Sequence, residues 1–252
     1  MPKARTAALK ALQLDDGLAE AHTSLALIAE NYDWDWQTSE KEYRRAIQLD
    51  SNYATAHQWY AEFLAYQGRF DEALVESERA RQLDPLSLII ATDNGTILYF
   101  SRNYDRAIER FRAVLDMDPS FEPANRIIGV YVEKKQFKAA LAEIEKWRHT
   151  ADSPWLRDWE AYAYGRMGET VKAQHAVQEL NRLNRTWHLD QAPLLAHAYA
   201  GMNDREKSLS WLLKAYSAHS NYLTTLKVDP SFDPLRDDPR FQDLLRRVGL
   251  AQ

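Results

Sequence analysis

The feature that most restricts the fold of this chain is a repeat with a period of about 34 residues, a period at which helical hairpins recur. When the stretch that begins HQWYAEFLAYQGRF is placed over the stretch that begins ATDNGTILYFSRNY, Ala61 meets Gly95 and Pro85 meets Pro119. In arrays of this kind each hairpin has an apolar face that it cannot bury alone. We therefore expect consecutive hairpins to stack along one continuous core.

Small side chains mark the places where the two helices of each hairpin are expected to cross. The same step along the chain separates the paired small residues of four repeats: Ala61 and Ala73, Gly95 and Ala107, Ala161 and Ala173, and Ala196 and Ser208. Larger side chains there would overpack the crossing, at a cost of about 1–3 kcal/mol. The chain has only 8 glycines and 9 prolines, so few residues interrupt these helices.

The repeats resemble the tetratricopeptide (TPR) family, whose pattern is W-x2-L-G-x2-Y followed by A-x3-F. In one repeat Ala161-x2-Tyr164 is followed by Ala173-x3-Val177, and every other repeat fits the pattern in part. The resemblance covers nearly the whole chain. It implies an all-α fold, a right-handed superhelix (α-solenoid) of about six helical hairpins.

The resemblance also divides the chain into three parts. Residues 19–219 would form six TPR-like hairpins, and residues 1–18 a half-repeat, because their alanines match only the second helix of the pattern. Either the chain was cut from something longer or this helix is a native cap. Residues 220–252 break the period, contain three Asp-Pro turns and end in an amphipathic helix, so we expect them to cap the last apolar face.

The cluster NYDWDWQTSE at residues 31–40 could be a sugar-stacking platform, a metal loop or ordinary packing. The first loop carries one residue more than the others, because the small-to-small step from Ala26 to Ser39 is longer by one position. Trp36 then occupies the slot that holds an aromatic residue in other repeats, which predicts packing between helices. Only Trp34 is new, and the neighbouring aspartates are available as helix N-caps.

Charge and composition narrow the classes of partner. The 32 basic and 37 acidic residues give a net charge of −5, and the two signs alternate along the chain. This pattern is typical of solvated helix faces and argues against direct nucleic-acid or membrane binding. The absence of cysteine excludes disulfides and Cys-ligated zinc. Because the first residues do not form a signal peptide, we expect a cytoplasmic protein, or alternatively a periplasmic segment of a membrane-anchored regulator.

No common motif for acyl transfer, nucleotide binding or zinc hydrolysis is present, so we predict no catalytic residues, no metal site and no cofactor. His22 and His57 stand where the family pattern has Trp, which predicts packing with one satisfied ring nitrogen. Asn94 and Glu160 stand where the pattern has Leu. Glu160 is either a functional acid or, as we favour, a residue that reaches solvent or an arginine such as Arg126.

In TPR arrays the first helices line the concave face, so the resemblance implies a groove. Residues next to each small slot, and one turn away from it, would face this groove and form its ligand-binding stripe: Gln58, Glu62, Thr92, Thr96, Tyr99, Arg126, Val130, Glu133, Asp158, Tyr162 and His197. Their mixture of aromatic, hydroxyl and charged groups suits a peptide better than a polyanion. The alternative is a solvated helix face without a dedicated ligand.

Two stretches, YDWDWQTSEKEYRRAIQLD and VDPSFDPLRDDPRFQDLL, resemble the C-terminal TPR arrays of bacterial multidomain regulators, which follow a winged-helix domain, a Ser/Thr kinase or a cyclase. We therefore predict a non-catalytic protein–protein interaction module that binds a peptide or protein segment in its groove as a scaffold or sensor. The first alternative is a small-molecule effector domain with its site near Tyr99, Arg126 and Tyr162. The second is an enzyme that uses Glu160 or a histidine. The sequence leaves the oligomeric state open.

Overall fold

The computed structural model describes residues 2–148, 153–187 and 190–251, and within them it contains helices and no strand. Helix α1 (Pro2–Leu14) comes first. Six hairpins follow: α2 (Ala19–Ile28) with α3 (Trp36–Leu49), α4 (Ala54–Tyr66) with α5 (Phe70–Leu83), α6 (Leu88–Phe100) with α7 (Tyr104–Met117), α8 (Ile127–Glu133) with α9 (Phe137–Arg148), α10 (Pro154–Arg166) with α11 (Thr170–Trp187), and α12 (Ala192–Gly201) with α13 (Arg205–Ser217). The predicted all-α architecture of six hairpins is confirmed.

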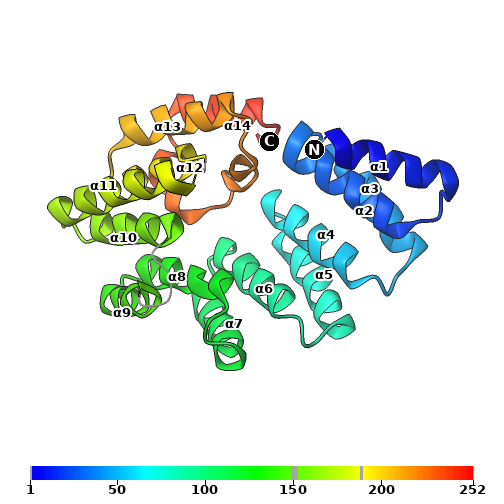
Figure 1. The fold of residues 1–252 in the computed structure, drawn as a ribbon, viewed down its shortest axis with the longest axis horizontal. Helices are drawn as coiled ribbons and strands as arrows, with labels where there is room; N and C mark the ends of the chain where they lie inside the picture. Colours follow the sequence, from blue (N-terminus) through cyan, green and yellow to red (C-terminus); the bar gives the residue numbers. More distant parts are fainter. Residues whose placement is uncertain (1, 149–152, 188–189, 252) are drawn as a thin grey trace.

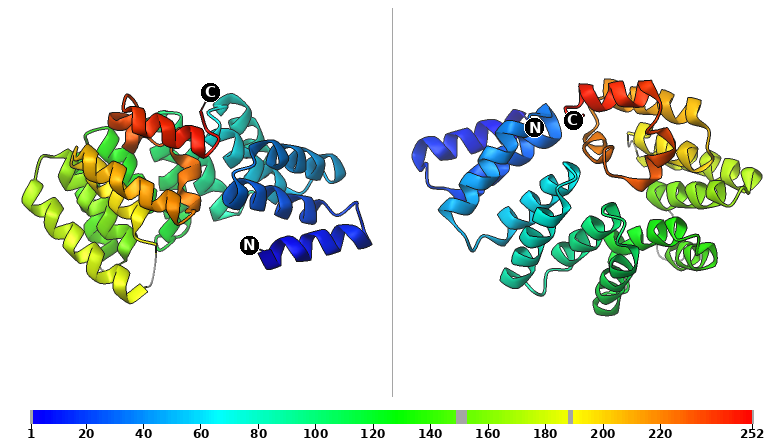
Figure 2. Two further views of the ribbon diagram at one scale, coloured as in Figure 1. Left: turned by 90° about the horizontal axis from the view of Figure 1, so that it is seen from above. Right: turned by 180° about the vertical axis from the view of Figure 1, so that it is seen from behind.

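The hairpins are arranged around a central space (Figure 1). The first helices of the hairpins, such as α6, α8, α10 and α12, lie toward this space, and the second helices, such as α7, α9 and α13, lie outside them (Figure 1). The array curves until its C-terminal helices come beside the first hairpin, as the view from behind also shows (Figure 2).

The small residues allow close approach, as expected. Ala61 and Ala161 are completely buried. A methyl group on Gly129 would come within 2.4 Å of the Trp159 ring of the next hairpin, and one on Gly201 would come within 2.8 Å of the Tyr162 backbone. These contacts between neighbouring hairpins are therefore as restrictive as those inside a hairpin.

Each hairpin turn uses one residue with left-handed backbone conformation, a region that favours glycine. These residues recur at the repeat period: Trp34 (φ 54°), Gly68 (φ 80°), Arg102 (φ 64°), Lys135 (φ 56°), Gly168 (φ 78°) and Asn203 (φ 56°). The extra residue of the first loop is absorbed by a π-helical turn, η1 (Ala29–Asp33), that widens the end of α2. Trp34 therefore stands where two other repeats have glycine.

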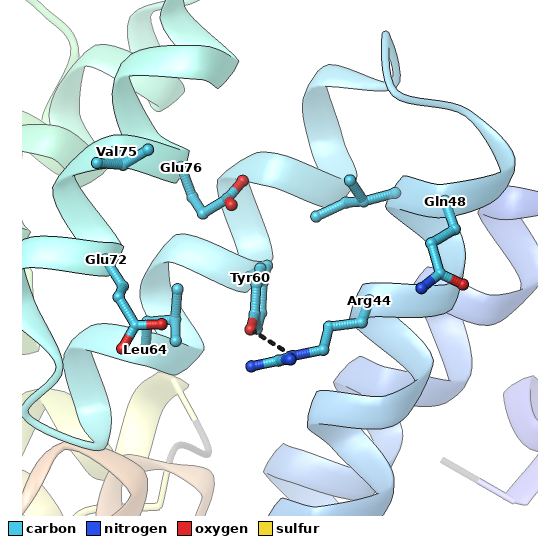
Figure 3. A pocket seen from close by; sticks show the side chains of 8 residues that line it. Arg44, Gln48, Tyr60, Leu64, Glu72, Val75 and Glu76 are labelled. Atoms are coloured by element: carbon cyan, nitrogen blue, oxygen red, sulfur yellow. Dashed lines mark hydrogen bonds between the residues drawn. The ribbon is translucent and has the colours of Figure 1, made fainter.

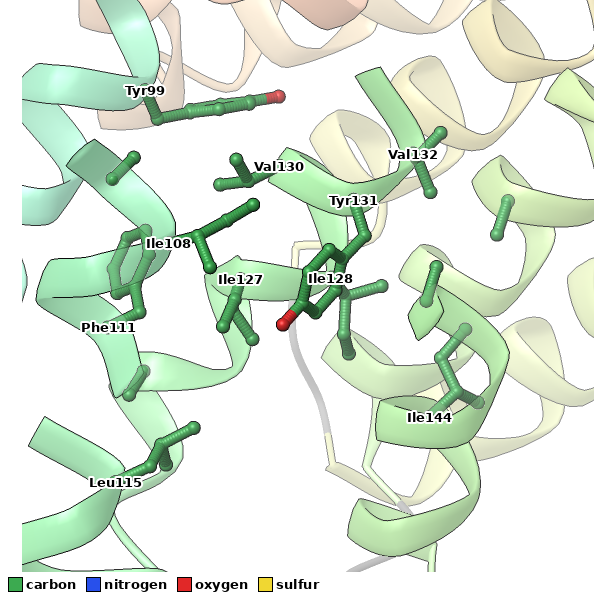
Figure 4. Close-up of a cluster of buried hydrophobic side chains, with 14 of the residues drawn as sticks. Tyr99, Ile108, Phe111, Leu115, Ile127, Ile128, Val130, Tyr131, Val132 and Ile144 are labelled. Carbon is green, nitrogen blue, oxygen red and sulfur yellow. The ribbon is translucent and has the colours of Figure 1, made fainter. Parts of the chain in front are cut away.

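The core of the middle hairpins is one cluster of buried apolar side chains (Figure 4). Tyr99, Phe111, Ile127 and Val130 lie at its centre and are at most 1% exposed. Val228, which lies far along the chain beyond the repeats, belongs to the same cluster. The C-terminal region is therefore part of the core of the array.

The C-terminal region contains η3 (Asn221–Thr225), η4 (Pro230–Leu235) and α14 (Pro239–Arg247). Phe241 and Leu244 of α14 are buried in a cluster with residues of α12 and α13, so this helix covers the last apolar face, as predicted. Two aspartates of the Asp-Pro turns cap the short helices, since Asp229 accepts a hydrogen bond from the Ser231 N–H and Asp238 from the Arg240 N–H. Residues 220–235, here called the inner segment, lie instead on the inside of the curve (Figure 1).

The tryptophan cluster joins the first hairpin to this C-terminal region. The indole Nε1 of Trp36 donates a hydrogen bond to the Val248 carbonyl at 2.7 Å, while its ring packs against Phe63 at 5.8 Å between centroids. Trp34 stacks on His219 with centroids 3.9 Å apart. Packing is therefore the role of the cluster, as predicted for Trp36, and Asp35 is the N-cap of α3. The sequence did not predict that this packing closes the array into a ring.

Candidate binding site on the concave face

The predicted stripe is divided by the inner segment into two parts. The first part, here called the covered groove, consists of Tyr99, Val130, Glu133, Asp158, Tyr162 and His197. The hydroxyl of Tyr99 lies 3.4 Å from Ser231 Oγ, and Arg102 donates hydrogen bonds to the Val228 carbonyl and, at 2.8 Å, to Asp233. The expectation of an open groove at these six residues is corrected, because the chain's own C-terminal region lies over them.

A buried hydrogen-bond network fixes the inner segment to the covered groove. Asp158 Oδ1 lies 2.8 Å from His197 Nδ1, and His197 Nε2 lies 3.0 Å from Ser231 Oγ. Burial alone would lower the pKa of His197, but the charge and hydrogen bond of Asp158 outweigh it and raise that pKa. Burial raises the pKa of Asp158, although His197 opposes this change.

The order of groups in this network is that of a Ser-His-Asp triad, in which histidine activates a serine nucleophile. Its surroundings do not suit catalysis. Ser231 is 0% exposed and His197 is 1% exposed, and the imidazole is stacked on Tyr162 at 4.3 Å between centroids. A substrate carbonyl cannot reach the serine oxygen in this structure, so the network serves to hold the inner segment.

The rest of the covered groove is also internally bonded. Glu133 accepts hydrogen bonds from the Tyr162 hydroxyl at 2.5 Å and from Arg166 at 2.8 Å. Val130 is completely buried within the core cluster that contains Val228. These side chains therefore already have partners within the chain.

The second part of the stripe borders a cavity of about 360 Å³, here called the open cavity, although Thr92, Thr96 and Gln58 are themselves buried. This volume lies within the usual range for ligand pockets, which starts at roughly 300 Å³. Its walls come from α4, α6, η2 (Glu122–Arg126), α10 and the inner segment: Glu62, Tyr66, Ile89, Thr92, Asp93, Thr96, Glu122, Pro123, Asn125, Arg126, Trp155, Trp159 and Thr225. Four predicted groove residues, Glu62, Thr92, Thr96 and Arg126, are thus brought together. A fifth, Gln58, lies behind them and donates a hydrogen bond to Asp93 at 2.6 Å.

Carboxyl groups dominate the electrostatics of the open cavity. Burial raises the pKa of Asp93 to about 6, although the Gln58 hydrogen bond and the charge of Arg126 act in the opposite direction. Burial, together with the charges of Asp93 and Glu30, raises the pKa of Glu62 well above its usual value. Burial also raises the pKa of Glu30, behind the cavity, to about 8. Desolvation therefore disfavours the ionised forms of these acids, and the charge of Arg126 does not fully offset this effect.

Aromatic and basic side chains complete the open cavity. Trp155 is 41% exposed, which is unusual for so large an apolar group, and Trp159 lies one turn further along α10. The guanidinium of Arg126 lies over the Phe100 ring at 5.9 Å. Among the described residues, Arg126 forms no ion pair within 4.0 Å.

A second hollow, of about 430 Å³, lies between the second helices of the first two hairpins, where Arg44, Tyr60 and Glu72 border it (Figure 3). Its charged groups are already paired. Glu40 accepts hydrogen bonds from Arg44 and from Arg69, each at 2.7 Å, and Arg44 Nε donates to the Tyr60 hydroxyl at 3.0 Å. This outer hollow therefore has fewer unpaired charged groups for a ligand to contact than the open cavity has.

The other residues selected from sequence have structural partners. Glu160 forms ion pairs with Arg148 at 2.6 Å and Arg157 at 2.7 Å, so an arginine partner was correct but its identity as Arg126 was wrong. Both ring nitrogens of His22 are engaged, by Glu42 and by the Asp16 carbonyl.

His57 repeats this arrangement with Glu76 and the Ser51 carbonyl, so both histidines have two engaged nitrogens where one was expected. Asn94 donates to Ser77 at 2.9 Å, and its Oδ1 is buried without a hydrogen bond from the protein.

Comparison with solved structures identifies the architecture. A tetratricopeptide-repeat protein from Parabacteroides merdae matches with a TM-score of 0.53 and 14% identity, over 92% of each chain. The chain has the TPR fold. PilF of Pseudomonas aeruginosa is similar with a TM-score of 0.56 and 20% identity, over 74% of this chain and 84% of PilF.

A chain of the Cut9–Hcn1 hetero-tetramer of APC/C matches 98% of this TPR array with a TM-score of 0.64 and 16% identity, and this array spans 45% of that chain. No protein-family model and no curated protein sequence matches the chain.

The described residues contain neither a candidate metal-ion site nor a membrane-spanning helix. No group of three or more His, Asp or Glu side chains is placed to hold a metal ion in residues 2–148, 153–187 and 190–251. In the same part of the chain, no helix combines the length and the apolar character needed to span a membrane.

Sequence reasoning missed nine side chains of the open cavity: Tyr66, Ile89, Asp93, Glu122, Pro123, Asn125, Trp155, Trp159 and Thr225. The acid in the otherwise apolar run LIIATDNGTILYF was a usable signal for Asp93, because a charged group inside a buried helix calls for a function or a partner. No signal in the sequence could place Thr225, since the inner segment follows no repeat.

Proposed function

We propose that this TPR array is a non-catalytic interaction module that binds an extended segment of a partner protein, with the open cavity as the main contact. The observation that carries the proposal is the exposed Trp155 in one cavity with Glu62 and Asp93, which form no ion pair within 4.0 Å among the described residues. Exposed aromatic residues that border a polar pocket are typical anchors of protein interfaces. The covered groove would not take part, because the inner segment occupies it.

The resemblance of two sequence stretches to arrays of bacterial multidomain regulators supports a wider role. In this proposal the array is the scaffold or sensor part of a larger cytoplasmic regulator, and binding at the open cavity positions that regulator on its partner. The alternating charges of the sequence support a protein partner in preference to nucleic acid.

A display library of random peptides, selected against the full chain, tests the proposed function. Selected peptides should lose affinity at least about tenfold, or 1.4 kcal/mol, for Trp155→Ala. The variant Val171→Ala is the matched control, because Val171 is 81% exposed on α11, away from the cavity. Peptides that bind both variants as tightly as the parent protein would exclude the open cavity as the site.

The alternative function is binding of a small-molecule effector, and the pocket-like volume of the open cavity favours it. Of the effector site predicted near Tyr99, Arg126 and Tyr162, only Arg126 borders the open cavity. A small ligand that binds the folded state raises the melting temperature by mass action. A metabolite that does so in a Trp155-dependent manner, with no peptide recovered from the library, would establish this alternative.

A further inference from the structure

The open cavity has more acidic than basic groups. Glu62, Asp93 and Glu122 line it, and Arg126 is its only basic lining residue. Glu30 adds a further carboxyl group near Glu62. Like charges that gather in a poorly solvated site disfavour one another's ionised forms, whereas a nearby cation favours them. A cation in the cavity would therefore relieve a cost that the free protein bears.

Arg126 fills this role only in part, because its charge favours the ionised acids but does not offset their burial. Its guanidinium lies over Phe100, and within the described part of the chain it makes no ion pair within 4.0 Å. Gln58 is the side chain that hydrogen-bonds Asp93, and an amide supplies no charge. The hydrogen bonds to these acids thus come from neutral groups, since Tyr66 bonds Glu62 as Gln58 bonds Asp93. A second guanidinium could supply the charged partner that they lack.

The aromatic side of the cavity gives independent support. Trp155 and Trp159 are four residues apart on α10 and so share one face of that helix. Both line the cavity, and Trp155 remains 41% exposed. An indole face attracts a cation, and arginine combines this attraction with planar stacking. Acids alone would not define a site, but an exposed indole facing acids across a cavity has the chemistry of a cation pocket.

We propose that the open cavity binds the side chain of an arginine in the partner segment, with the guanidinium between the indoles of α10 and the carboxyl groups of Glu62 and Asp93. This inference rests on the proposed function, because it names the residue that the partner must carry. Arginine fits better than lysine because its planar fork can hydrogen-bond carboxylates and stack on an indole at the same time. The volume of about 360 Å³ leaves room for one long side chain.

Three capped pentapeptides test the inference with the full chain. They differ only at the central residue, which is arginine, lysine or citrulline, the neutral isostere of arginine. Tryptophan fluorescence and calorimetry give the dissociation constants. We expect the arginine peptide to bind roughly tenfold more tightly than the citrulline peptide, since only arginine forms charge-assisted hydrogen bonds to the carboxylates. The lysine peptide should fall between them. Equal affinity of the arginine and citrulline peptides, or no binding of the arginine peptide at millimolar concentration, would overturn the inference.

Variants of the protein provide the second arm. The double variant Glu62→Gln, Asp93→Asn should bind the arginine and citrulline peptides within about threefold of each other, because the charge that distinguishes them is gone. The control Glu109→Gln removes an exposed acid of α7 and should retain the full preference. Circular dichroism checks the fold of each variant.

Different results would contradict the proposed function and the arginine inference. If library peptides depend on Trp155 but carry no basic residue, the proposed function stands and the arginine inference is wrong. If no library peptide depends on Trp155 while the arginine pentapeptide still binds there, the cavity recognises a cation without acting as a protein-binding site.

Discussion

Two parts of the same inner face keep buried acids in different surroundings. In the covered groove, Asp158 lies 2.8 Å from His197, which in turn contacts Ser231, so each polar group has a partner in the chain. In the open cavity, the Gln58 amide is the one group of the described residues that hydrogen-bonds Asp93, and the pKa of Asp93 rises to about 6. Completed networks contribute to the folded state, whereas incomplete ones cost stability that only a function would justify. The comparison therefore assigns the covered groove to structure and supports the proposed binding role of the open cavity.

The largest expected change in stability concerns the covered groove. His197→Ala should lower the free energy of unfolding by about 3–5 kcal/mol, because it removes the hydrogen-bond partner of the buried Asp158 and one partner of Ser231. Urea denaturation measures this loss. His175→Ala, at an exposed histidine of α11, should change stability by less than about 0.5 kcal/mol. Equal stability of both variants would mean that the network does not hold the inner segment.

The second test concerns the acids behind the open cavity. The folded-state pKa of Glu30 is about 8, above its ordinary value of 4.5, so its contribution to stability is complete below pH 4.5 and is lost as the pH rises through 8. Between pH 6 and pH 9 the protein should lose roughly 2 kcal/mol of stability from this group. Glu30→Gln, which keeps an acceptor for the Tyr43 hydroxyl, should remove most of that loss.

Chemical denaturation at pH 6, 7, 8 and 9 follows this change, with Glu109→Gln as the exposed control. A parent protein whose stability stays level across this range would show that Glu30 is ionised in the folded state. The buried acids would then have partners, and the contrast between the two parts of the inner face would weaken.

The third test concerns the ring closure that joins the first hairpin to the C-terminal region. Trp36→Phe keeps an aromatic ring against Phe63 but removes the hydrogen bond to the Val248 carbonyl, so stability should fall by about 1 kcal/mol. Trp36→Ala should cost about 3–5 kcal/mol, because it also removes the packing. Thermal unfolding of both variants separates the two contributions, and equal losses would show that the hydrogen bond, not the ring, stabilises the closure.

The sequence predicted those features that depend on local spacing. The repeat period indicated the hairpins, and small residues such as Gly129 marked real close approaches, here against Trp159. One additional residue in the first loop correctly indicated a local change, which the structure shows as a π-helical turn. Such features follow from helix geometry, which acts over short separations along the chain.

The course of the inner segment could not be predicted from the sequence. For that reason the sequence also could not show which part of the predicted stripe is covered. Residues 220–235 follow no period, and their position depends on contacts such as Ser231 with Tyr99, which lie 132 residues apart. The stripe of groove residues was chosen as if the central space were empty. Once the inner segment fills part of that space, the same helix faces become core at Tyr162 and the wall of a cavity at Glu62.

The smallest expected effect concerns Arg102, which has left-handed backbone conformation (φ 64°) in a turn where two other repeats have glycine. A non-glycine residue costs roughly 1–2 kcal/mol in this region, so Arg102→Gly would relieve strain. The same change removes hydrogen bonds to the Val228 carbonyl and Asp233 of the inner segment. We expect the two effects to offset each other to within about 1 kcal/mol of global stability. Amide hydrogen exchange in residues 226–235 should nevertheless become faster.

Lys135→Gly is the matched control for this last test, because Lys135 has the same backbone conformation (φ 56°) and an exposed side chain. It should stabilise the protein by about 1 kcal/mol and leave exchange in the inner segment unchanged. If Arg102→Gly stabilises the protein equally and exchange stays slow, Arg102 does not clamp the segment. If exchange accelerates only in Arg102→Gly, a strained side chain is retained at the turn because it holds the covered groove closed, while the open cavity beside it stays free for a partner.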